Sequence, residues 1–423
     1  MKLTVSPLLP STINYQPLQI QVNSYQQAID AWAKHQNEFE LAEYYLDQAW
    51  KFVPPDNDAR AFVKERSAWT KCRILKYAEA LECAKRAWQI KRDAPQLATL
   101  IECELAVGDL LSARQLGKLA LRFPESWGKE ATRIKEGISR MSRSNVKIYG
   151  EIEPKLLDPK KKIGFYPPIE NGPTQKLTKI TVNNVLSWKK KLDENGNTYI
   201  QVNTDGSKPF QFAFELQIQP YSVLDYIKSG QVSTENVEKY LGKSQGYSSD
   251  DLIDPNSKIA SVIVRPFTSS DKVQTANNIL RWIASNMKFG AEGMKNAEIS
   301  DRILVARRGH CEHLATATAA LLRNAGIPAR LVRGWNLDPS KKTALLGQHT
   351  VCEYFLDNRW VRTNSERSVI PGLMEAGYIS RFHTTVTFDK KSLECILDGF
   401  ETKNPRHTYE PVYHSDVLSS SID

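Results

Sequence analysis

The segment Arg308–Arg330 constrains the fold of this chain most, because it places one cysteine at the start of a long apolar helix. It begins Arg-Gly-His-Cys-Glu-His-Leu and ends Asn-Ala-Gly-Ile-Pro-Ala-Arg. Apolar residues recur at helical spacing through Cys311–Ala325, and Gly326 followed by a proline ends the helix. The first N–H groups of a helix lack intrahelical partners and the helix dipole adds positive charge, which together favour a thiolate. Since the thiolate is the form that attacks a carbonyl carbon, Cys311 is a candidate nucleophile.

Three histidines could exchange a proton with this cysteine. Neighbouring helical residues point about 100° apart, so His310 is poorly placed, and His313 lies roughly on the opposite side of the helix. His349 falls on a predicted strand, which the fold can bring opposite Cys311. A zinc site made of His310, Cys311 and His313 is disfavoured, because three ligands on one helical turn are too crowded to converge on an ion. We therefore predict a Cys311–His349 pair and neither a metal nor another cofactor.

A hairpin is predicted from His349–Leu356 to Trp360–Ser365, around the turn residues Asp357–Asn358. If these two residues form the turn, Trp360 pairs with Phe355. The side chains of His349 and Asn364 then share a face as diagonal neighbours.

This register provides a group that can orient the imidazole of His349. The Asn364 carbonyl can accept the imidazole N–H and fix the tautomer, without the charge stabilisation that a carboxylate would add. Glu366, which would face His349 directly, is a competing orienter. The candidate catalytic set is therefore Cys311, His349 and Asn364.

Four segments together resemble the transglutaminase-like superfamily. They are Gly309-x-Cys311, the run Leu322–Gly334, His349-x-x-x-Glu353 and Trp360-x-x-x-Asn364. The resemblance covers roughly residues 270–390 and implies a papain-like fold with a Cys-His-Asp triad, whose positions map to Cys311, His349 and Asn364. It also implies a hydrolase or acyl transferase that acts on peptide or side-chain amide bonds through a thioester.

The chain departs from the family pattern at two positions. Val351 stands where the family often has an aromatic residue, and Asn364 replaces the acid, which gives a papain-type Cys-His-Asn set. The alternative hypothesis is therefore a catalytically weak or inactive scaffold that binds a protein partner through its helical repeats. Arg330 and Glu353 also match family positions, and we interpret them as an internal ion pair.

The pattern from about 21 to 145 is helical throughout and contains an internal repeat. Alanines recur seven residues apart in three related stretches, at positions 42/49, 80/87 and 113/120. Small residues at this spacing let one helix pack closely on another, and a proline follows each stretch. The pattern resembles about three degenerate tetratricopeptide repeats, with Gly108-Asp109 as the turn inside the last unit. Such arrays bind a peptide or protein partner.

The region from 146 to 265 changes to period-two alternation, which predicts a small antiparallel β domain of the sandwich type. Its candidate strands are Asn145–Glu153, Thr178–Val182, Thr198–Val202 and Phe210–Ile218. Beyond it we expect helices over Asp271–Ser285 and Glu298–Arg307, and strands over Ala329–Trp335 and Thr384–Phe388. The predicted fold is thus α+β and multidomain: helical repeats at 21–145, a β-sandwich-like domain at 146–265, a papain-like transglutaminase core at 266–400, and a flexible tail at 401–423.

Composition excludes several other classes of function. The net charge of +9 is modest for 423 residues, and its short lysine runs fit solvated loops better than a nucleic-acid surface. No segment approaches the about 18 apolar residues that a membrane span needs. The six cysteines form no CxxC pair, and the first residues lack the apolar core of a secretory signal. We therefore expect a cytoplasmic protein whose partner is a peptide or protein substrate, with no nucleic acid and no membrane.

Overall fold

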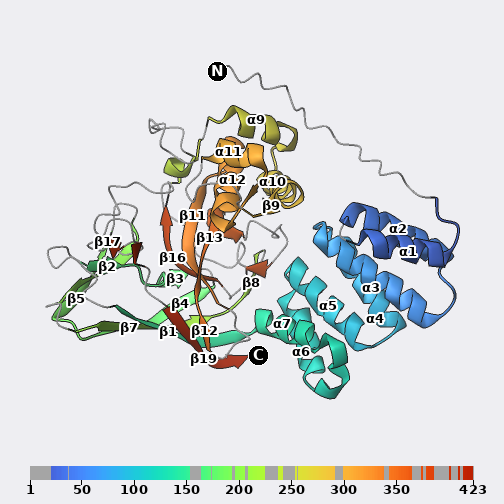
Figure 1. The fold of residues 1–423 in the computed structure, drawn as a ribbon, viewed down its shortest axis with the longest axis horizontal. Coiled ribbons are helices and arrows are strands. Elements are labelled where there is room, and N and C mark those ends of the chain that lie inside the picture. Colours follow the sequence, from blue (N-terminus) through green and yellow to red (C-terminus); the bar gives the residue numbers. More distant parts are fainter. Residues whose placement is uncertain are drawn as a thin grey trace. The chain divides into compact units, whose positions relative to one another are not determined.

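The computed structural model describes residues 21–36, 38–152, 163–172, 174–192, 196–204, 208–223, 237–241, 253–254, 256–290, 299–337, 343–363, 373–374, 378–384, 400–401, 408–409 and 413–422. The chain forms two compact units, residues 1–103 and 104–423. Figure 1 labels the helices and strands of both. No helix within the described ranges is long and apolar enough to cross a membrane.

The first third of the chain is helical, as the sequence predicts. Its elements are α1 Tyr25–His35, α2 Phe39–Phe52, α3 Asn57–Arg73, α4 Tyr77–Ile90, α5 Ala94–Val107, α6 Leu110–Ala120, the 3-10 helix η1 Pro124–Glu130, and α7 Ala131–Met141. Three of them, α1, α3 and α6, begin at a residue whose side chain caps the helix. Asp56 and Asp109 accept hydrogen bonds from the first turns of α3 and α6, for example.

The repeat pattern corresponds to alternate helices. The three alanine pairs lie in α2, α4 and α6, and each alanine is at most 2% exposed: Ala42, Ala49, Ala80, Ala87, Ala113 and Ala120. Gly108 adopts a φ of 79° between α5 and α6, a conformation that glycine takes without strain. The region therefore fits helical repeats in which every second helix buries a small-residue face.

An ion pair and a thiol contact join helices within the first unit. Lys71 of α3 pairs with Glu43 of α2, and also with Glu79 of α4 at 3.1 Å. The sulfur atoms of Cys72 and Cys103 lie 3.4 Å apart. The hydrogen bond with Cys72, together with burial, raises the pKa of Cys103 well above that of an ordinary thiol.

Two antiparallel sheets form the middle of the second unit. Their strands are β1 Arg143–Ile152, β2 Ile163–Phe165, β3 Asn171–Gly172, β4 Gln175–Asn183, β5 Ser187–Leu192, β6 Thr198–Asn203, β7 Phe210–Ile218, β12 Thr343–Leu345 and β19 Tyr413–Ser421. One sheet has the order β12-β19-β1-β7-β4-β3, and the other has the order β2-β6-β5. The first is seen along the lower edge of Figure 1, where β19 lies beside β1.

Alternation along the strands creates one core between these sheets. In β7 every second side chain from Phe210 to Ile218 is buried, and the residues between them are more exposed. These side chains pack in one cluster with Phe165 of β2 and with Ile200 and Val202 of β6. The sandwich prediction is therefore supported, because both sheets contribute their apolar faces to a shared interior.

The expected boundaries around this core need correction. Residues 401–423 were expected to be a flexible tail, but Tyr413–Ser421 is strand β19 and pairs with β1 from Arg143↔Ser421 to Gly150↔Tyr413. Trp335, Leu337 and Leu346, which belong to the expected core at 266–400, are buried in the sandwich cluster. The boundary at 265 therefore does not separate two hydrophobic cores. The serine-rich sequence of β19 does not predict a strand, because this segment is ordered by pairing with β1, which is far away in sequence.

The remaining elements build the second half of this unit. They are η3 Glu238–Tyr240, α9 Lys258–Val264, η4 Arg265–Phe267, α10 Lys272–Asn286, β9 Lys288–Phe289, α11 Ser300–Ala306, β10 Arg308–Gly309, α12 Cys311–Asn324, β11 Ala329–Asn336, β13 Gly347–Leu356, β14 Arg359–Thr363 and β16 Tyr378–Thr384. Short strands β8 Tyr221–Ser222, β15 Leu373–Met374, β17 Phe400–Glu401 and β18 Thr408–Tyr409 complete the described set.

A four-stranded sheet with the order β14-β13-β11-β16 supports helix α12. The helices and strands predicted between residues 271 and 365 all form, with ends that differ by a few residues. At the final predicted strand the structure describes β16, Tyr378–Thr384, which includes Thr384; residues 385–388 lie outside the described part, so the rest of this prediction is untested.

Candidate functional site

Cys311 is the first residue of α12 and carries a free, half-buried thiol. The helix behind it is almost entirely buried from His313 to Arg323. The backbone N–H of Cys311, in the first turn of the helix, has no hydrogen-bond partner within the helix. The structure thus places a partly accessible thiol at the positive end of a rigid, buried helix.

The sequence before Cys311 fixes how this helix begins. Strand β10 pairs in parallel with β9, with Arg308 opposite Lys288 and Gly309 opposite Phe289. The next residue, His310, is the N-cap in an extended conformation. The long helix therefore starts at Cys311 because the preceding chain is held in a short strand.

His313 has a structural role at this helix start. Its Nδ1 atom accepts a hydrogen bond of 3.0 Å from the backbone N–H of His310, and its side chain is buried. The imidazole thus satisfies an N–H close to Cys311, as a capping side chain does. This agrees with the sequence argument that His313 is not the catalytic base.

Gly309 is the residue that makes room for this cap. A Cβ atom at Gly309 would lie 2.2 Å from the Cβ of His313, which is attached to the backbone and cannot swing away. We expect Gly309→Ala to destabilise the protein by about 1–3 kcal/mol through overpacking. Gly347→Ala is the matched control, since no atom lies within 4 Å of a Cβ there. Equal urea midpoints for both variants would contradict this explanation.

The hairpin that carries His349 has the predicted register. Phe355 pairs with Trp360, and the ladder continues to Cys352↔Thr363. Asp357 and Asn358 both have positive φ, 47° and 63°, as a two-residue hairpin turn requires. Asn364 and Glu366, the two candidate orienters, lie outside the described residues, so their roles stay predictions.

His349 lies near the start of β13, opposite Gly334 of β11. Its ring is 5.8 Å from the ring of Tyr378, which belongs to β16 on the other side of β11. The Tyr378 hydroxyl donates to the carbonyl oxygen of Val332 at 2.7 Å, and it lies 3.2 Å from the carbonyl oxygen of His349. Tyr378 therefore supports the backbone and the ring of the candidate base.

Tyr378 is a buried side chain in contact with His349. Burial raises the pKa of its hydroxyl well above the usual value, and among the charges that act on it Arg362 lowers the pKa while Glu353 and Cys311 raise it. Sequence reasoning missed Tyr378, because the pairing of β16 with β11 leaves no local signal.

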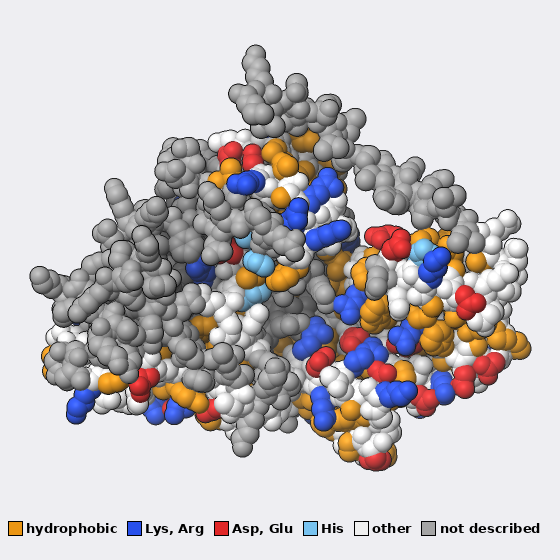
Figure 2. Space-filling view, in the orientation of Figure 1, with side chains coloured by type: hydrophobic (Ala, Val, Ile, Leu, Met, Phe, Trp, Pro, Cys, Tyr) orange, Lys and Arg blue, Asp and Glu red, His pale blue; other side chains and the backbone are white. Residues whose placement is uncertain are grey.

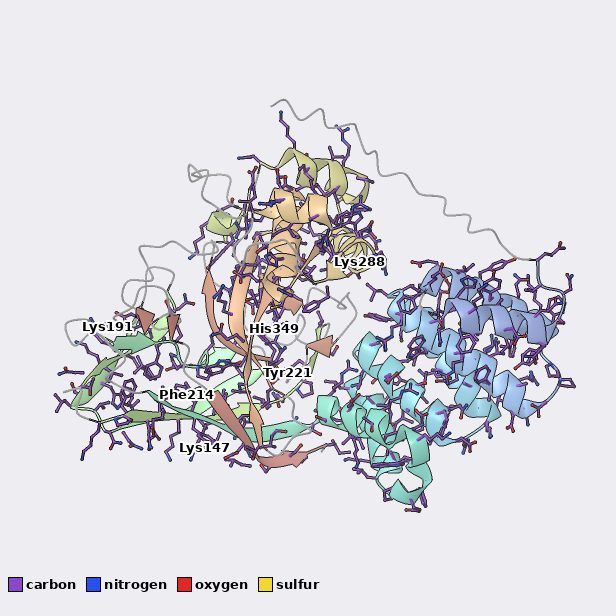
Figure 3. All side chains as sticks on the ribbon, in the orientation of Figure 1. Lys147, Lys191, Phe214, Tyr221, Lys288 and His349 are labelled. Carbon is purple, nitrogen blue, oxygen red and sulfur yellow. The ribbon has the colours of Figure 1, made fainter. Side chains whose placement is uncertain are left out.

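The histidine side chains that the structure describes in the second unit lie in one area. Its described histidine side chains are His310, His313 and His349, and the rings of His310 and His313 are 6.1 Å apart. Figure 2 shows pale-blue groups together in the middle of this unit's face. Figure 3 labels His349 in the same central area, beneath the helices.

Two ion pairs hold the sheet and the helix start. Arg330 and Glu353 form the predicted internal pair at 2.8 Å, with side chains only 10% and 3% exposed. The Arg330 guanidinium also lies 3.9 Å from the ring centre of Trp360. Glu312, next to Cys311, pairs with Arg333 of β11 at 2.7 Å and so fixes the first turn of α12 to the sheet.

Polar contacts fasten β16 to the sandwich. The side-chain amide of Gln175 donates to the carbonyl oxygen of Ser380 at 2.8 Å and accepts from its N–H at 2.7 Å. The guanidinium of Arg362 donates to the hydroxyl of Thr174 at 2.9 Å and stacks on Tyr378, 5.0 Å from the ring centre. The strand that carries Tyr378 is thus held by residues about 200 positions earlier in the chain.

Across the described residues, no group of three or more His, Cys, Asp or Glu side chains is spaced to hold a metal ion.

Comparison with known proteins finds one matching family and solved structures of low similarity. Residues 262–365 match the transglutaminase-like superfamily. No curated protein matches the sequence. Among solved structures, a candidate cysteine protease from Cytophaga hutchinsonii is similar at 12% identity and a TM-score of 0.40, over 66% of this chain and 89% of that one. The periplasmic domain of TgpA from Pseudomonas aeruginosa is similar at 14% identity and a TM-score of 0.27, over 56% and 94%.

Proposed function

Because residues 262–365 form a transglutaminase-like domain, we propose that this protein is a cysteine-nucleophile hydrolase acting on peptide or side-chain amide bonds. The observation that carries the proposal is the free, half-buried thiol of Cys311 at the start of buried helix α12, with His349 on β13, the strand that packs against this helix. Acyl transfer requires a nucleophile and a base within reach of one another, and the packing of α12 against β13 supports these roles for Cys311 and His349.

The mechanism follows the chemistry of these two side chains. The Cys311 thiolate attacks the amide carbonyl, and the resulting tetrahedral intermediate collapses to a thioester as the C–N bond breaks. The His349 imidazolium gives its proton to the leaving amine. His349 then takes a proton from water, which attacks the thioester; the C–S bond breaks, the acid is released, and the thiolate and imidazolium are restored.

Two further groups have proposed roles. Asn364, which continues β14 in sequence, would accept the N–H of His349 and fix its tautomer. The backbone N–H of Cys311, as the first of a helix, would donate to the oxyanion of the tetrahedral intermediate. The Tyr378 contacts with His349 would keep the imidazole in place between turnovers.

Hydrolysis is preferred over transfer to an amine, because transfer needs an acceptor site shielded from water. The alternative function is a weakly active or inactive scaffold that binds a protein through its helical repeats, which we compare to tetratricopeptide repeats. The departure at Asn364 favours this alternative, since a neutral amide stabilises an imidazolium less than a carboxylate does. We also propose that the protein is cytoplasmic, because the pattern of its cysteines predicts no disulfide framework.

The two functions differ in whether an acyl group forms on Cys311. We expect incubation with a panel of peptides and glutamine-containing amides, followed by acid quenching, to trap a thioester on Cys311 that mass spectrometry locates. Cys311→Ser should lose both the adduct and product release, and Cys83→Ser should keep both. Turnover that persists in Cys311→Ser would contradict the proposed nucleophile. A wild-type protein that forms no adduct and no product with any substrate would favour the scaffold.

A further inference from the structure

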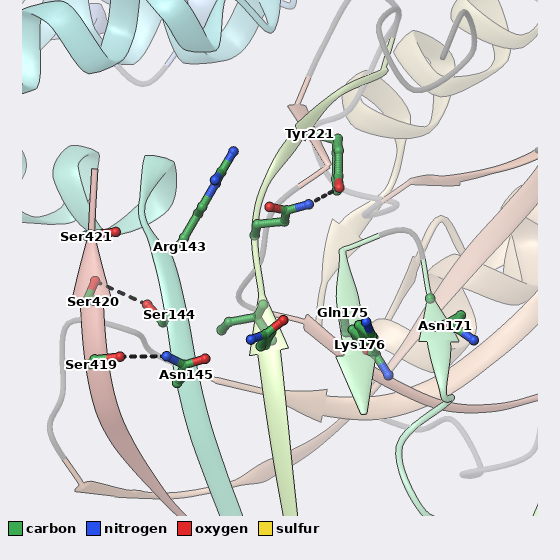
Figure 4. Close-up of a pocket in the computed structure, with 14 residues that line it drawn as sticks. Arg143, Ser144, Asn145, Asn171, Gln175, Lys176, Tyr221, Ser419, Ser420 and Ser421 are labelled. Carbon is green, nitrogen blue, oxygen red and sulfur yellow. Dashed lines mark hydrogen bonds between the residues drawn. The ribbon is translucent and has the colours of Figure 1, made fainter. Parts of the chain in front are cut away.

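A polar cavity of about 520 Å³ lies on the sandwich, built by residues that the proposed reaction does not use. Figure 4 shows it at the end of the six-stranded sheet. Its lining residues are Arg143, Ser144, Asn145, Asn171, Gly172, Gln175, Lys176, Gln217, Ile218, Gln219, Tyr221, Ser419, Ser420 and Ser421. This volume is typical of small-ligand sites.

Strand register arranges five of these side chains in one row. Ser419 of β19 pairs with Asn145 of β1, Asn145 with Gln217 of β7, Gln217 with Lys176 of β4, and Lys176 with Asn171 of β3. All five are exposed on the same face of the sheet. Five adjacent strands make the row roughly 19 Å long.

The row offers hydrogen-bonding groups that the protein itself leaves largely unused. Asn145 donates to the Ser419 hydroxyl at 2.8 Å, and Gln219 donates to the Tyr221 hydroxyl, as Figure 4 shows. The side-chain amides of Gln217 and Asn171 make no hydrogen bond within the described part of the chain. Amide groups both donate and accept, so they suit a ligand that presents closely spaced hydroxyl groups.

The charge of the lining is one-sided. Arg143 and Lys176 are its two cations, and no lining residue is acidic. Neither cation has an ion pair or hydrogen bond among the described residues. Figure 4 shows both side chains extending beside the row. Two unpaired cations without a competing carboxylate favour an anionic ligand.

The lining does not suit an extended peptide. The three central strands of the lining, β1, β7 and β4, have neighbours on both sides, so a peptide strand cannot add to them. Among the lining strands, only β3 and the Ser419–Ser421 end of β19 lie at the edges of the described sheet. Ile218, the one aliphatic side chain in the lining, is itself buried. Peptide side chains would therefore find few apolar pockets, whereas the hydroxyl groups of a sugar would meet amides, hydroxyls and cations.

From these observations we propose that the cavity binds an acidic glycan of about disaccharide size, whose negative charge is attracted by both Arg143 and Lys176. This site is separate from the Cys311 site and independent of the proposed hydrolysis. The glycan hydroxyls contact the row formed by Asn145, Gln217 and Asn171.

Calorimetric titration of the full chain tests the proposal with two matched ligand pairs. These are digalacturonate against neutral galactobiose, and 3′-sialyllactose against lactose. We expect at least one acidic glycan to bind, and its neutral counterpart to bind at least about tenfold more weakly, as the loss of a charge-assisted hydrogen bond implies. Failure of both acidic glycans to bind at millimolar concentration would overturn the proposal, as would equal binding of the neutral ones.

Variants separate this site from general surface charge. Lys176→Ala and Arg143→Ala should each weaken binding by about tenfold. Lys179→Ala is the matched control, since Lys179 is also an exposed lysine of β4 but pairs with Glu215 outside the cavity. Equal weakening by Lys179→Ala, or stronger binding of a diglutamate peptide than of either glycan, would overturn the assignment. Cys311→Ala should bind as the wild type does, so the outcome does not depend on the proposed reaction.

Discussion

Replacement of Glu353 by alanine is expected to lower the free energy of unfolding by about 3–5 kcal/mol, because it leaves the guanidinium of Arg330 buried without its partner. Both side chains are almost completely buried, and the pair joins β11 to β13 behind the candidate site. Packing against Trp360 keeps Arg330 from moving into solvent. Urea denaturation of the full chain, followed by circular dichroism, measures the change.

Glu312→Ala provides the comparison. Glu312 and Arg333 also form an ion pair, but their side chains are 22% and 17% exposed. Water can solvate the remaining arginine there, so we expect a loss of about 1 kcal/mol or less. The double variant Arg330→Met/Glu353→Leu should recover much of the stability that Glu353→Ala loses, because it removes the unpaired charge. Equal destabilisation by Glu353→Ala and Glu312→Ala would contradict the importance of burial.

The fragment 265–400 is expected not to fold by itself, although it contains all but the first three residues of the transglutaminase-like match at 262–365. It would expose Trp335, Leu337 and Leu346, which are buried in the sandwich cluster. It would also leave Arg362 and the backbone of Ser380 without Thr174 and Gln175. The free-energy cost of losing several apolar contacts and leaving buried polar groups unpaired exceeds the marginal free energy of unfolding of a domain.

The fragment 94–423 serves as the positive control, since it retains the second unit and begins at the first residue of α5. We expect fragment 94–423 to unfold in one cooperative transition. Fragment 265–400 should show no sharp unfolding transition. A cooperative transition and native near-ultraviolet dichroism in fragment 265–400 would show that the shared core is dispensable.

Local signals in the sequence predicted much of this structure. The hairpin between β13 and β14 has the expected register, because a two-residue turn fixes the pairing of its own strands. The helix that begins at Cys311 and the alanine faces of α2, α4 and α6 were equally local, since each is encoded within a few turns. Their prediction needed only periodicity and turn residues.

Pairings between distant segments escaped prediction. Strand β19 lies against β1 although about 270 residues separate them in sequence, and its serine-rich composition gives little hydrophobic alternation. Tyr378 was missed for a similar reason, because β16 reaches β11 across a long stretch of intervening chain. Such contacts depend on the whole topology, and one sequence contains no local pattern that specifies them.

The candidate site shows both outcomes. Cys311 and His349 are predicted from the sequence, and the structure places Cys311 at the start of α12 and the ring of His349 beside that of Tyr378. His313 was dismissed as a base for its position on the helix, and its hydrogen bond to His310 provides it with another role. That bond depends on backbone geometry at the N-cap, which the residue types alone do not specify.

The other cysteines set the requirements for a reactivity test. Burial raises the pKa of the thiols of Cys83 and Cys352. A hydrogen bond with Cys72 and burial raise the pKa of Cys103. These thiols should alkylate slowly, because the thiolate is the reactive form. Mass spectrometry that quantifies each cysteine separately, including Cys72 and Cys395, then isolates the behaviour of Cys311.

The most direct measurement is the rate of Cys311 alkylation by iodoacetamide as a function of pH, in the wild type and in His349→Ala. We expect Cys311 to be alkylated rapidly well below ~pH 8, where a free cysteine is largely protonated, and we expect His349→Ala to lose this reactivity. Alkylation of Cys311 no faster than that of a free peptide thiol, and unchanged by His349→Ala, would contradict the proposed roles of Cys311 and His349.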